Sequence, residues 1–334
     1  MRATNTNNLF SHLDLVPEHK MDPAFKALRD SKYHAEARQL INNIYNRMGD
    51  PNGNFVKDFQ LNGFHARLFE VACFAYLDSL DIVCDRSYGM PDFMASKNGI
   101  TAAIEAVTAN PSDGKSRDIS IMRLLNIPHD EMKKKCENEF LIRMANSLEK
   151  KIRHKYWELE HCSEKPLVFM IAPYFEPGSL CYIDESLAVY LYGIVDEHIY
   201  NGRKVTSGFF DKEGSRYVSA VIYCNQFTVP RFFRMSANPN NNKSVITIRE
   251  GFCLHRGNNS LLQTADYQYV LGDTDVPVEN WWQGVTIFLN PNAVMPLPEG
   301  FLRSTSTFKV ENDYIVRIVH DFHPLTSMMY VYCK

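Results

Sequence analysis

Three carboxylate residues in the first third of the chain stand where the surrounding sequence predicts burial. Glu70 lies in an apolar stretch, Asp92 follows a proline, and Glu105 interrupts a run of alanine, isoleucine and valine. A buried charge is costly unless it is paired, hydrogen-bonded or bound to a metal. Because Mg²⁺ and Mn²⁺ prefer oxygen ligands, the three side chains together indicate a metal site with Asp92, Glu105 and Glu70 as ligands.

The residues around Glu70 predict a buried helix. From Leu68 to Leu77, all side chains except that of Glu70 are apolar or weakly polar. Such a helix has no polar stripe on which Glu70 meets water. Arg67 lies one turn earlier and is the local candidate for an ion pair. A buried pair of Glu70 and Arg67 without a functional role is therefore the alternative to a metal ligand.

Asp92 and Glu105 are predicted to lie on neighbouring strands. Pro91 removes a backbone donor, so the strand that contains Asp92 is irregular or at an edge there, and a turn-capping aspartate is the alternative interpretation. Glu105 lies in a short run of small and β-branched residues, which predicts a central strand. The pair Asn98-Gly99 between them predicts a tight hairpin, which brings the two acids onto adjacent antiparallel strands.

This order of elements and acids resembles the PD-(D/E)XK nuclease superfamily, whose core is the restriction-endonuclease-like αβββαβ unit. The shared features are a helix with one Glu, a strand with Pro-Asp, and a following strand with a second acid. The resemblance covers residues 63–171, about a third of the chain. The expected elements are, in order, a helix at 63–80, strands at 81–85, 90–96 and 100–107, a helix at 139–158 and a strand at 166–171.

The motif of the family places a lysine two residues after its second acid, where this chain has Val107. The resemblance implies that the lysine comes from elsewhere in the core, commonly the following helix. At about 100° per residue, Lys155 falls on the apolar face of a helix at 139–158 and Lys151 at its edge. A lysine on a buried face needs a nearby anion. Lys155 is the first candidate and Lys151 the second; the alternative is that Lys155 extends its charged end to water.

The composition fits a folded α/β protein with a mixed sheet. The 334 residues are 45% hydrophobic and carry a net charge of −3, which argues against a strongly basic clamp for nucleic acid. The eight cysteines have no spacing typical of zinc sites or of a disulfide framework. No segment predicts a membrane span or the apolar core of a signal peptide. We therefore expect a cytoplasmic protein that does not contact a membrane.

Three regions are predicted along the chain. Residues 1–55 form an N-terminal helical arm, residues 56–194 form the nuclease-like α/β core, and residues 195–334 form a β-rich region that extends the core or makes a second lobe. In that last region, apolar runs separated by turn residues predict strands at 218–223, 244–248, 284–289 and 314–319.

The resemblance implies a Mg²⁺-dependent endonuclease, with Mn²⁺ as the alternative ion, that hydrolyses phosphodiester bonds. Asp92 and Glu105 would hold the metal, Glu70 would help to position it, and Lys155 or Lys151 would stabilise developing negative charge. The implied partner is nucleic acid, DNA in preference to RNA. Restriction or phage defence is the implied setting, with a homodimer or a partner protein as further options.

Val107 keeps a second class of function open. A nuclease-like fold that has lost hydrolysis would serve as a module that binds nucleic acid or protein. A third interpretation is an unrelated α/β protein in which the three acids are structural. The sequence does not distinguish single-stranded from double-stranded substrates.

Overall fold

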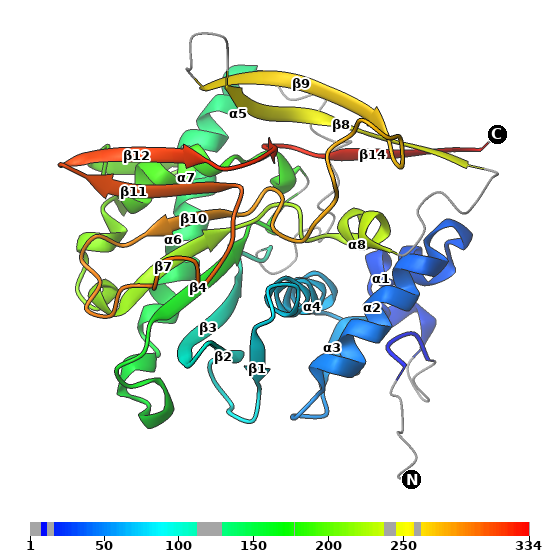
Figure 1. Ribbon diagram of the computed structural model, residues 1–334, viewed down its shortest axis with the longest axis horizontal. Coiled ribbons are helices and arrows are strands. Elements are labelled where there is room, and N and C mark those ends of the chain that lie inside the picture. The colour runs from blue at the N-terminus through cyan, green and yellow to red at the C-terminus, as the bar shows by residue number, and fades with distance from the viewer. Residues whose placement is uncertain are drawn as a thin grey trace.

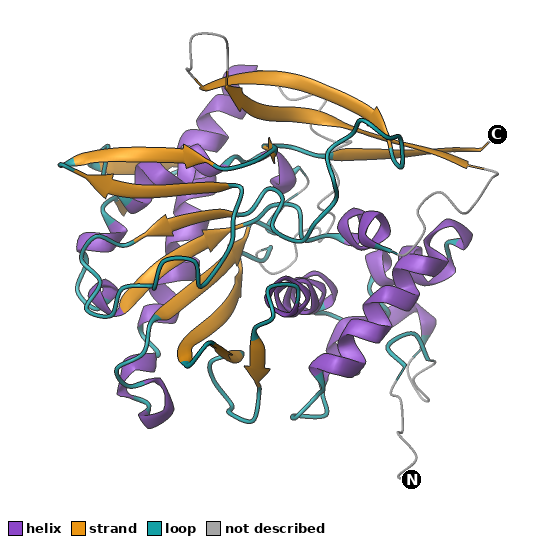
Figure 2. Ribbon diagram, viewed as in Figure 1, coloured by secondary structure: helices purple, strands orange, loops and turns teal. Residues whose placement is uncertain are grey.

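A mixed β-sheet with helices on both faces forms the centre of the protein (Figures 1 and 2). The computed structural model describes residues 8–11, 17–111, 129–176, 178–236, 245–256 and 262–333. Within these residues the central sheet has eight strands in the order β1-β2-β3-β4-β7-β10-β11-β12. This arrangement confirms the mixed α/β class predicted from the sequence.

The described strands and helices have the following bounds. The strands of the central sheet are β1 (Val83–Asp85), β2 (Phe93–Lys97), β3 (Ile100–Thr108), β4 (Leu167–Ala172), β7 (Val218–Tyr223), β10 (Thr286–Leu289), β11 (Ser306–Glu311) and β12 (Tyr314–Val319). The other strands are β5 (Glu197–Tyr200), β6 (Arg203–Thr206), β8 (Val245–Arg256), β9 (Leu262–Val270), β13 (His323–Pro324) and β14 (Met328–Cys333). The α-helices are α1 (Pro23–Asp30), α2 (Ala35–Met48), α3 (Phe55–Gln60), α4 (Phe64–Asp78), α5 (His129–Lys134), α6 (Phe140–Ile152), α7 (Asp184–Leu191) and α8 (Val229–Met235).

The first half of the sheet follows the predicted order of elements. After α4, the strands β1, β2 and β3 pair antiparallel, and β4 pairs parallel with β3 after the chain has passed through α6. Asn98 and Gly99 make the two-residue turn between β2 and β3, with φ angles of 52° and 77°. A turn of this kind matches the twist of the strands it connects, so it fixes the register of the hairpin.

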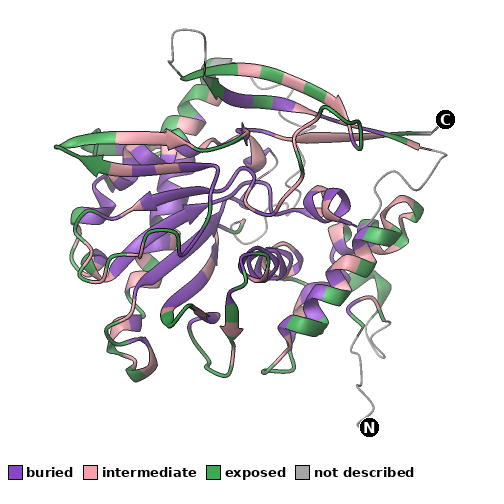
Figure 3. Ribbon diagram, viewed as in Figure 1, coloured by how far each residue is buried: buried purple, intermediate pink, exposed green. Residues whose placement is uncertain are grey.

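Helix α4 covers one face of this sheet. It is buried there because it is apolar on every side. All its residues from Leu68 to Leu77 are buried, and Figure 3 shows α4 in the colour of buried residues. Its apolar core includes Ala102 and Ile104 of β3. Alternate residues of a strand face opposite sides, so Ala103 and Val107 belong instead to the core on the face covered by α6.

Helix α6 is amphipathic and ends earlier than predicted. Leu141, Met144 and Leu148 are buried against the sheet, and the helix stops at Ile152. Lys155 then adopts a left-handed conformation with a φ of 51°, which an α-helix does not accommodate. A short turn at residues 156–158 follows. The prediction that one helix continues to residue 158 is therefore wrong.

The N-terminal helices pack on the outer side of α4. Apolar residues of α1, α2 and α3 belong to the same core as those of α4. Phe25, Phe59 and Phe64 meet edge-on or tilted, with ring centroids 5.1–6.5 Å apart, an arrangement favoured by aromatic rings. Helices α1 and α2 lie within the predicted N-terminal helical arm.

The C-terminal residues both lengthen the central sheet and build a second one. Strands β7, β10, β11 and β12 continue the sheet beyond β4, while β8 pairs with β9, β13 and β14. The second sheet lies along the top of the view in Figure 1. Strands predicted at 218–223, 284–289 and 314–319 are present, whereas β8 is longer than predicted and β9, β11 and β14 were not predicted.

None of the helices in the described residues combines the length and the apolar character that crossing a membrane requires.

Candidate metal centre

The β2–β3 hairpin places Asp92 against Glu105. Phe93 pairs with Ile104, so the next position outward sets Asp92 opposite Glu105. The backbone N–H of Asp92 donates to Oε2 of Glu105 at 3.1 Å. In return, the backbone N–H of Ala106 donates to Oδ2 of Asp92 at 2.8 Å. These two hydrogen bonds orient both carboxylates at one point on the hairpin, as the predicted turn requires.

Glu105 faces α6, where a lysine meets it. Glu105 is 6% exposed and lies on the same side of β3 as Ala103 and Val107. The ammonium of Lys151, in the last turn of α6, forms an ion pair with Oε1 of Glu105. Tyr156 also lies beside Glu105, and burial followed by the charge of Glu105 raises the pKa of its hydroxyl. The lysine that neutralises Glu105 thus comes from α6, between β3 and β4 in the chain.

The surroundings of Asp92 disfavour a negative charge on its carboxyl group in the metal-free protein. Burial, then Glu105 and then Glu70, raises the pKa of Asp92 to about 8 from an ordinary value of 3.8. The hydrogen bond from Ala106 and the charge of Lys151 act in the opposite direction without cancelling these effects. A cation between the carboxylates of Asp92 and Glu105 would remove the repulsion. These oxygen donors fit Mg²⁺ or Mn²⁺.

Glu70 is held by two arginines. Its Oε2 accepts from Nη1 of Arg67 at 2.8 Å, and its Oε1 pairs with Nη2 of Arg86. Arg86 also donates from Nη1 to the carbonyl of Gly49 at 2.8 Å and from Nε to the carbonyl of Asp92 at 3.4 Å. Glu70 therefore anchors the loop that carries Asp92. This arrangement favours a positioning role for Glu70 over the predicted role of metal ligand.

The geometry supports fewer metal ligands than the three that the sequence predicts. Within the residues that the structure describes, no group of three or more His, Cys, Asp and Glu side chains is arranged to hold a metal ion. The centre supported by the geometry has two protein carboxylates, Asp92 and Glu105. A Mg²⁺ ion commonly binds through one or two carboxylates and completes its shell with water and substrate oxygens, so a two-carboxylate centre is compatible with this ion.

The two candidate lysines have different positions. Lys155 pairs with Glu158 at 2.8 Å, and both side chains are more than half exposed. It does not contact the acids, because α6 ends before it and the backbone turns away. The prediction of Lys155 on the buried helix face is wrong, and Lys151, the second candidate, is the lysine beside Glu105.

Two further contacts at this site were not identified in the sequence. Arg86 lies beside Phe93, with its guanidinium carbon 5.4 Å from the ring centroid. His161 hydrogen-bonds to the carbonyl of Met90 at 2.8 Å and stacks on Tyr88 at 3.9 Å between ring centroids. Both contacts hold the loop before Asp92. The partners in the His161 contact are 71 positions apart, so no local pattern indicates it.

Replacing Glu70 by glutamine is expected to destabilise the protein by about 3 kcal/mol, because it leaves Arg86 without its buried anion. Urea denaturation of the metal-free protein measures the change. The matched control is Asp78→Asn, also on α4, which removes a largely exposed pair with Arg47 and is expected to cost at most about 0.5 kcal/mol. Equal stabilities of the two variants would contradict the anchoring role of Glu70.

Comparison of the chain with protein-family models, with curated proteins and with solved structures gives no match.

Proposed function

We propose that the protein is a metal-dependent nuclease that hydrolyses phosphodiester bonds, with DNA preferred over RNA as substrate. The observation that carries this proposal is the meeting of Asp92, Glu105 and Lys151 at one point on the β2–β3 hairpin and the end of α6. Two carboxylates for a hard divalent cation and one cation for a phosphate are the groups that hydrolysis of a phosphodiester needs.

The order of elements supports a restriction-endonuclease-like core. Helix α4 is followed by the antiparallel strands β1, β2 and β3, and α6 leads to β4 beside β3. In this core Asp92 directly precedes β2, Glu105 lies on β3 and Lys151 lies on α6. Val107 is 2% exposed on the α6 side of β3. Lys151 approaches the same side of the strand, so it can replace the lysine that the family motif has at this position.

The roles of the side chains follow from their contacts. Asp92 and Glu105 would hold Mg²⁺ or Mn²⁺, which when bound supplies an activated water and polarises the phosphate. Glu70 and Arg86 keep the loop before β2 in place. Lys151 orients Glu105 and, with a side chain 26% exposed, can also reach a phosphate at the edge of the site. Its positive charge would stabilise negative charge that develops during hydrolysis.

The proposal is tested by incubating the protein with supercoiled plasmid and with linear single-stranded DNA in Mg²⁺ or Mn²⁺. We expect cleavage that stops in EDTA and returns when the metal is restored. The double variant Asp92→Asn/Glu105→Gln, purified in parallel, controls for contaminating nucleases. Equal cleavage by the wild type and the double variant, or cleavage that persists in EDTA, would contradict the proposal.

A second candidate function is a binding module with the same fold and no hydrolysis. The observation that favours it is the ion pair of Lys151 with Glu105. Among the described residues, Lys151 is the one lysine paired with either acid, and position 107 has no cation. This module would bind DNA with unchanged affinity after EDTA treatment and would leave it intact. A gel-shift titration alongside the cleavage assay separates the two functions.

A further inference from the structure

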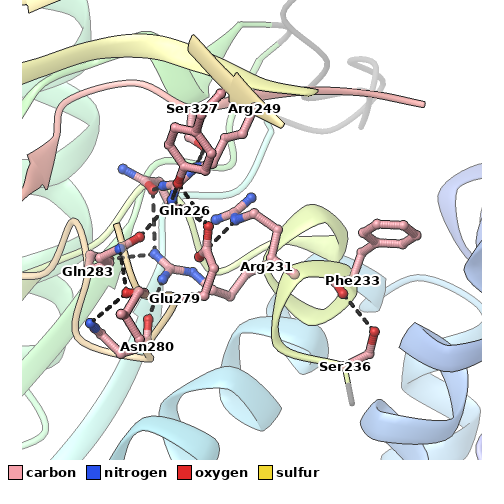
Figure 4. Close-up of polar contacts among 12 residues, drawn as sticks. Gln226, Arg231, Phe233, Ser236, Arg249, Glu279, Asn280, Gln283 and Ser327 are labelled. Carbon is pink, nitrogen blue, oxygen red and sulfur yellow. Dashed lines mark hydrogen bonds and ion pairs between the residues drawn. The ribbon is translucent and has the colours of Figure 1, made fainter. Parts of the chain in front are cut away.

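Three arginines are buried together between α8 and the second sheet. Arg231 and Arg234 lie one turn apart on α8, and Arg249 lies on β8. Their exposed fractions are 0%, 3% and 0%. Figure 4 shows Arg231 and Arg249 reaching from these two elements toward the segment that contains Glu279 and Gln283. We call these three residues the arginine cluster.

The hydrogen bonds of the arginine cluster are mostly to neutral groups. Arg231 donates to the backbone carbonyls of Asn280 at 2.6 Å and Gln283 at 2.5 Å. Arg249 donates to side-chain oxygens of Ser327, Tyr269, Gln283 and Gln226 at 2.7–3.3 Å. These groups satisfy donors, but they do not neutralise charge.

Glu279 is the one carboxylate paired with the cluster in the described residues. It accepts from Nη1 of Arg249 at 2.7 Å and from Nε of Arg234 at 3.1 Å. The neighbouring arginines outweigh its burial and lower its pKa to about 2. Three guanidinium groups and one carboxylate leave two positive charges in excess. Buried charge of this kind is costly without an anion.

Two donors in the cluster also have no hydrogen-bond partner. Nε of Arg231 and Nη2 of Arg234 are both fully buried and make no hydrogen bond. A buried charged donor without an acceptor costs more than a neutral one. Burial lowers the pKa of Arg231 to about 9 and that of Arg234 below its ordinary value. Since guanidinium groups keep their proton in proteins, the cluster lacks an acceptor for these two donors and carries more positive than negative charge.

We propose that the arginine cluster binds a doubly charged tetrahedral oxyanion, the chemistry of inorganic phosphate and of the terminal phosphate of a nucleotide. A phosphate monoester carries about −1.5 to −2 charges at neutral pH, which matches the excess. Guanidinium groups bind phosphate oxygens through paired N–H donors. The site lies outside the candidate metal centre, and its occupation does not depend on the proposed nuclease activity.

The test is thermal unfolding of the full chain with increasing inorganic phosphate or AMP, at constant ionic strength adjusted with KCl. Saturating anion is expected to raise the midpoint by about 3–6 °C. A response to AMP at lower concentration than to phosphate assigns the site to nucleotides, and equal responses assign it to free phosphate. An unchanged midpoint with both anions overturns the proposal.

Variants assign the anion to the arginine cluster. Arg234→Gln is expected to abolish the shift. The matched control Arg303→Gln removes an exposed arginine that stacks on Trp282, 4.3 Å from the ring centroid, and is expected to keep the shift. A shift that persists in Arg234→Gln places the anion elsewhere and overturns the proposal.

If Arg234→Gln does not fold, the variant Glu279→Gln tests whether the arginine cluster binds the anion. Loss of the carboxylate increases the excess charge, so the midpoint without anion is expected to fall and the rise with phosphate to exceed that of the wild type. A purely structural network predicts a midpoint that stays equally low at every phosphate concentration, and this result would overturn the proposal.

Discussion

Replacing Asp92 by asparagine is expected to reduce the initial rate of metal-dependent DNA cleavage by at least about 10³-fold, because one of two carboxylate ligands is lost. The hydrogen bond that Oδ2 of Asp92 accepts from Ala106 can be kept by the amide oxygen, so the hairpin should retain its geometry. Initial rates at saturating Mn²⁺ measure the effect. Circular dichroism of both proteins checks that the fold is unchanged.

Asp92→Asn is expected to lower the cleavage rate but to increase the stability of the metal-free protein. The pKa of Asp92 rises from 3.8 to about 8 because of burial, Glu105 and Glu70, against the weaker effect of Lys151. Between these values the folded protein holds a proton that the unfolded chain releases, so the unfolding free energy falls as pH rises. Asparagine removes this dependence. In EDTA, Asp92→Asn should therefore be more stable than the wild type at pH 8, with a smaller difference at pH 5.

Two outcomes would contradict this account of Asp92. One is a variant that cleaves DNA at the wild-type rate, which would exclude a ligand role. The other is a variant that is less stable than the wild type at pH 8 in EDTA, which would make Asp92 a structural residue of the hairpin. The combination of lost activity and gained stability is specific to a carboxylate kept for a cation.

Lys151→Met is expected to lower the cleavage rate by about 10²-fold, through the loss of a cation that stabilises developing charge. The effect should appear in kcat more than in KM, because the charge acts on the reaction rather than on binding of the DNA. Lys151→Arg should recover part of the rate. Single-turnover kinetics with excess enzyme separate the chemical step from binding.

The matched control is Lys155→Met. This lysine follows the same helix but pairs with the exposed Glu158, so its removal should change the rate by less than about threefold, as for exposed pairs in general. Equal losses in the two variants would indicate a general contribution of positive charge to DNA binding. A large loss in Lys155→Met alone would contradict the assignment of Lys151.

The hairpin that joins the two acids could be predicted because its signals are local. Asn98 and Gly99 tolerate the positive φ angles of the turn, and this two-residue turn sets the register of β2 and β3. Once that register is known, Asp92 and Glu105 must be neighbours. The burial of Glu70 and its pair with Arg67 follow in the same way from the helical pattern around it.

The lysine could not be assigned because the end of α6 carries no clear stop signal. Residues 153–155 contain neither glycine nor proline, and in the sequence the helical spacing of apolar residues continues past them. The left-handed conformation of Lys155 is set by the packing of the following turn, where Tyr156 is buried beside Glu105. One missed helix end moved the candidate lysine from Lys151 to Lys155.

The arginine cluster could not be predicted because its parts are far apart in the chain. Arg234 and Glu279 are 45 positions apart, and they meet only when α8 packs beside the second sheet. Strand β9 of that sheet is rich in polar and tyrosine residues, so its apolar pattern is weak. Long-range pairing of this kind depends on tertiary structure and leaves no periodic signal.

The central claim, that Asp92 and Glu105 form a divalent-metal centre, is tested most directly by calorimetric titration of the metal-free protein with Mn²⁺. The account predicts saturable binding to the wild type that is lost in both Asp92→Asn and Glu105→Gln and retained in Glu70→Gln, since Glu70 is committed to its arginines. Absence of Mn²⁺ binding to the wild type, or binding of equal strength to Asp92→Asn, would contradict it.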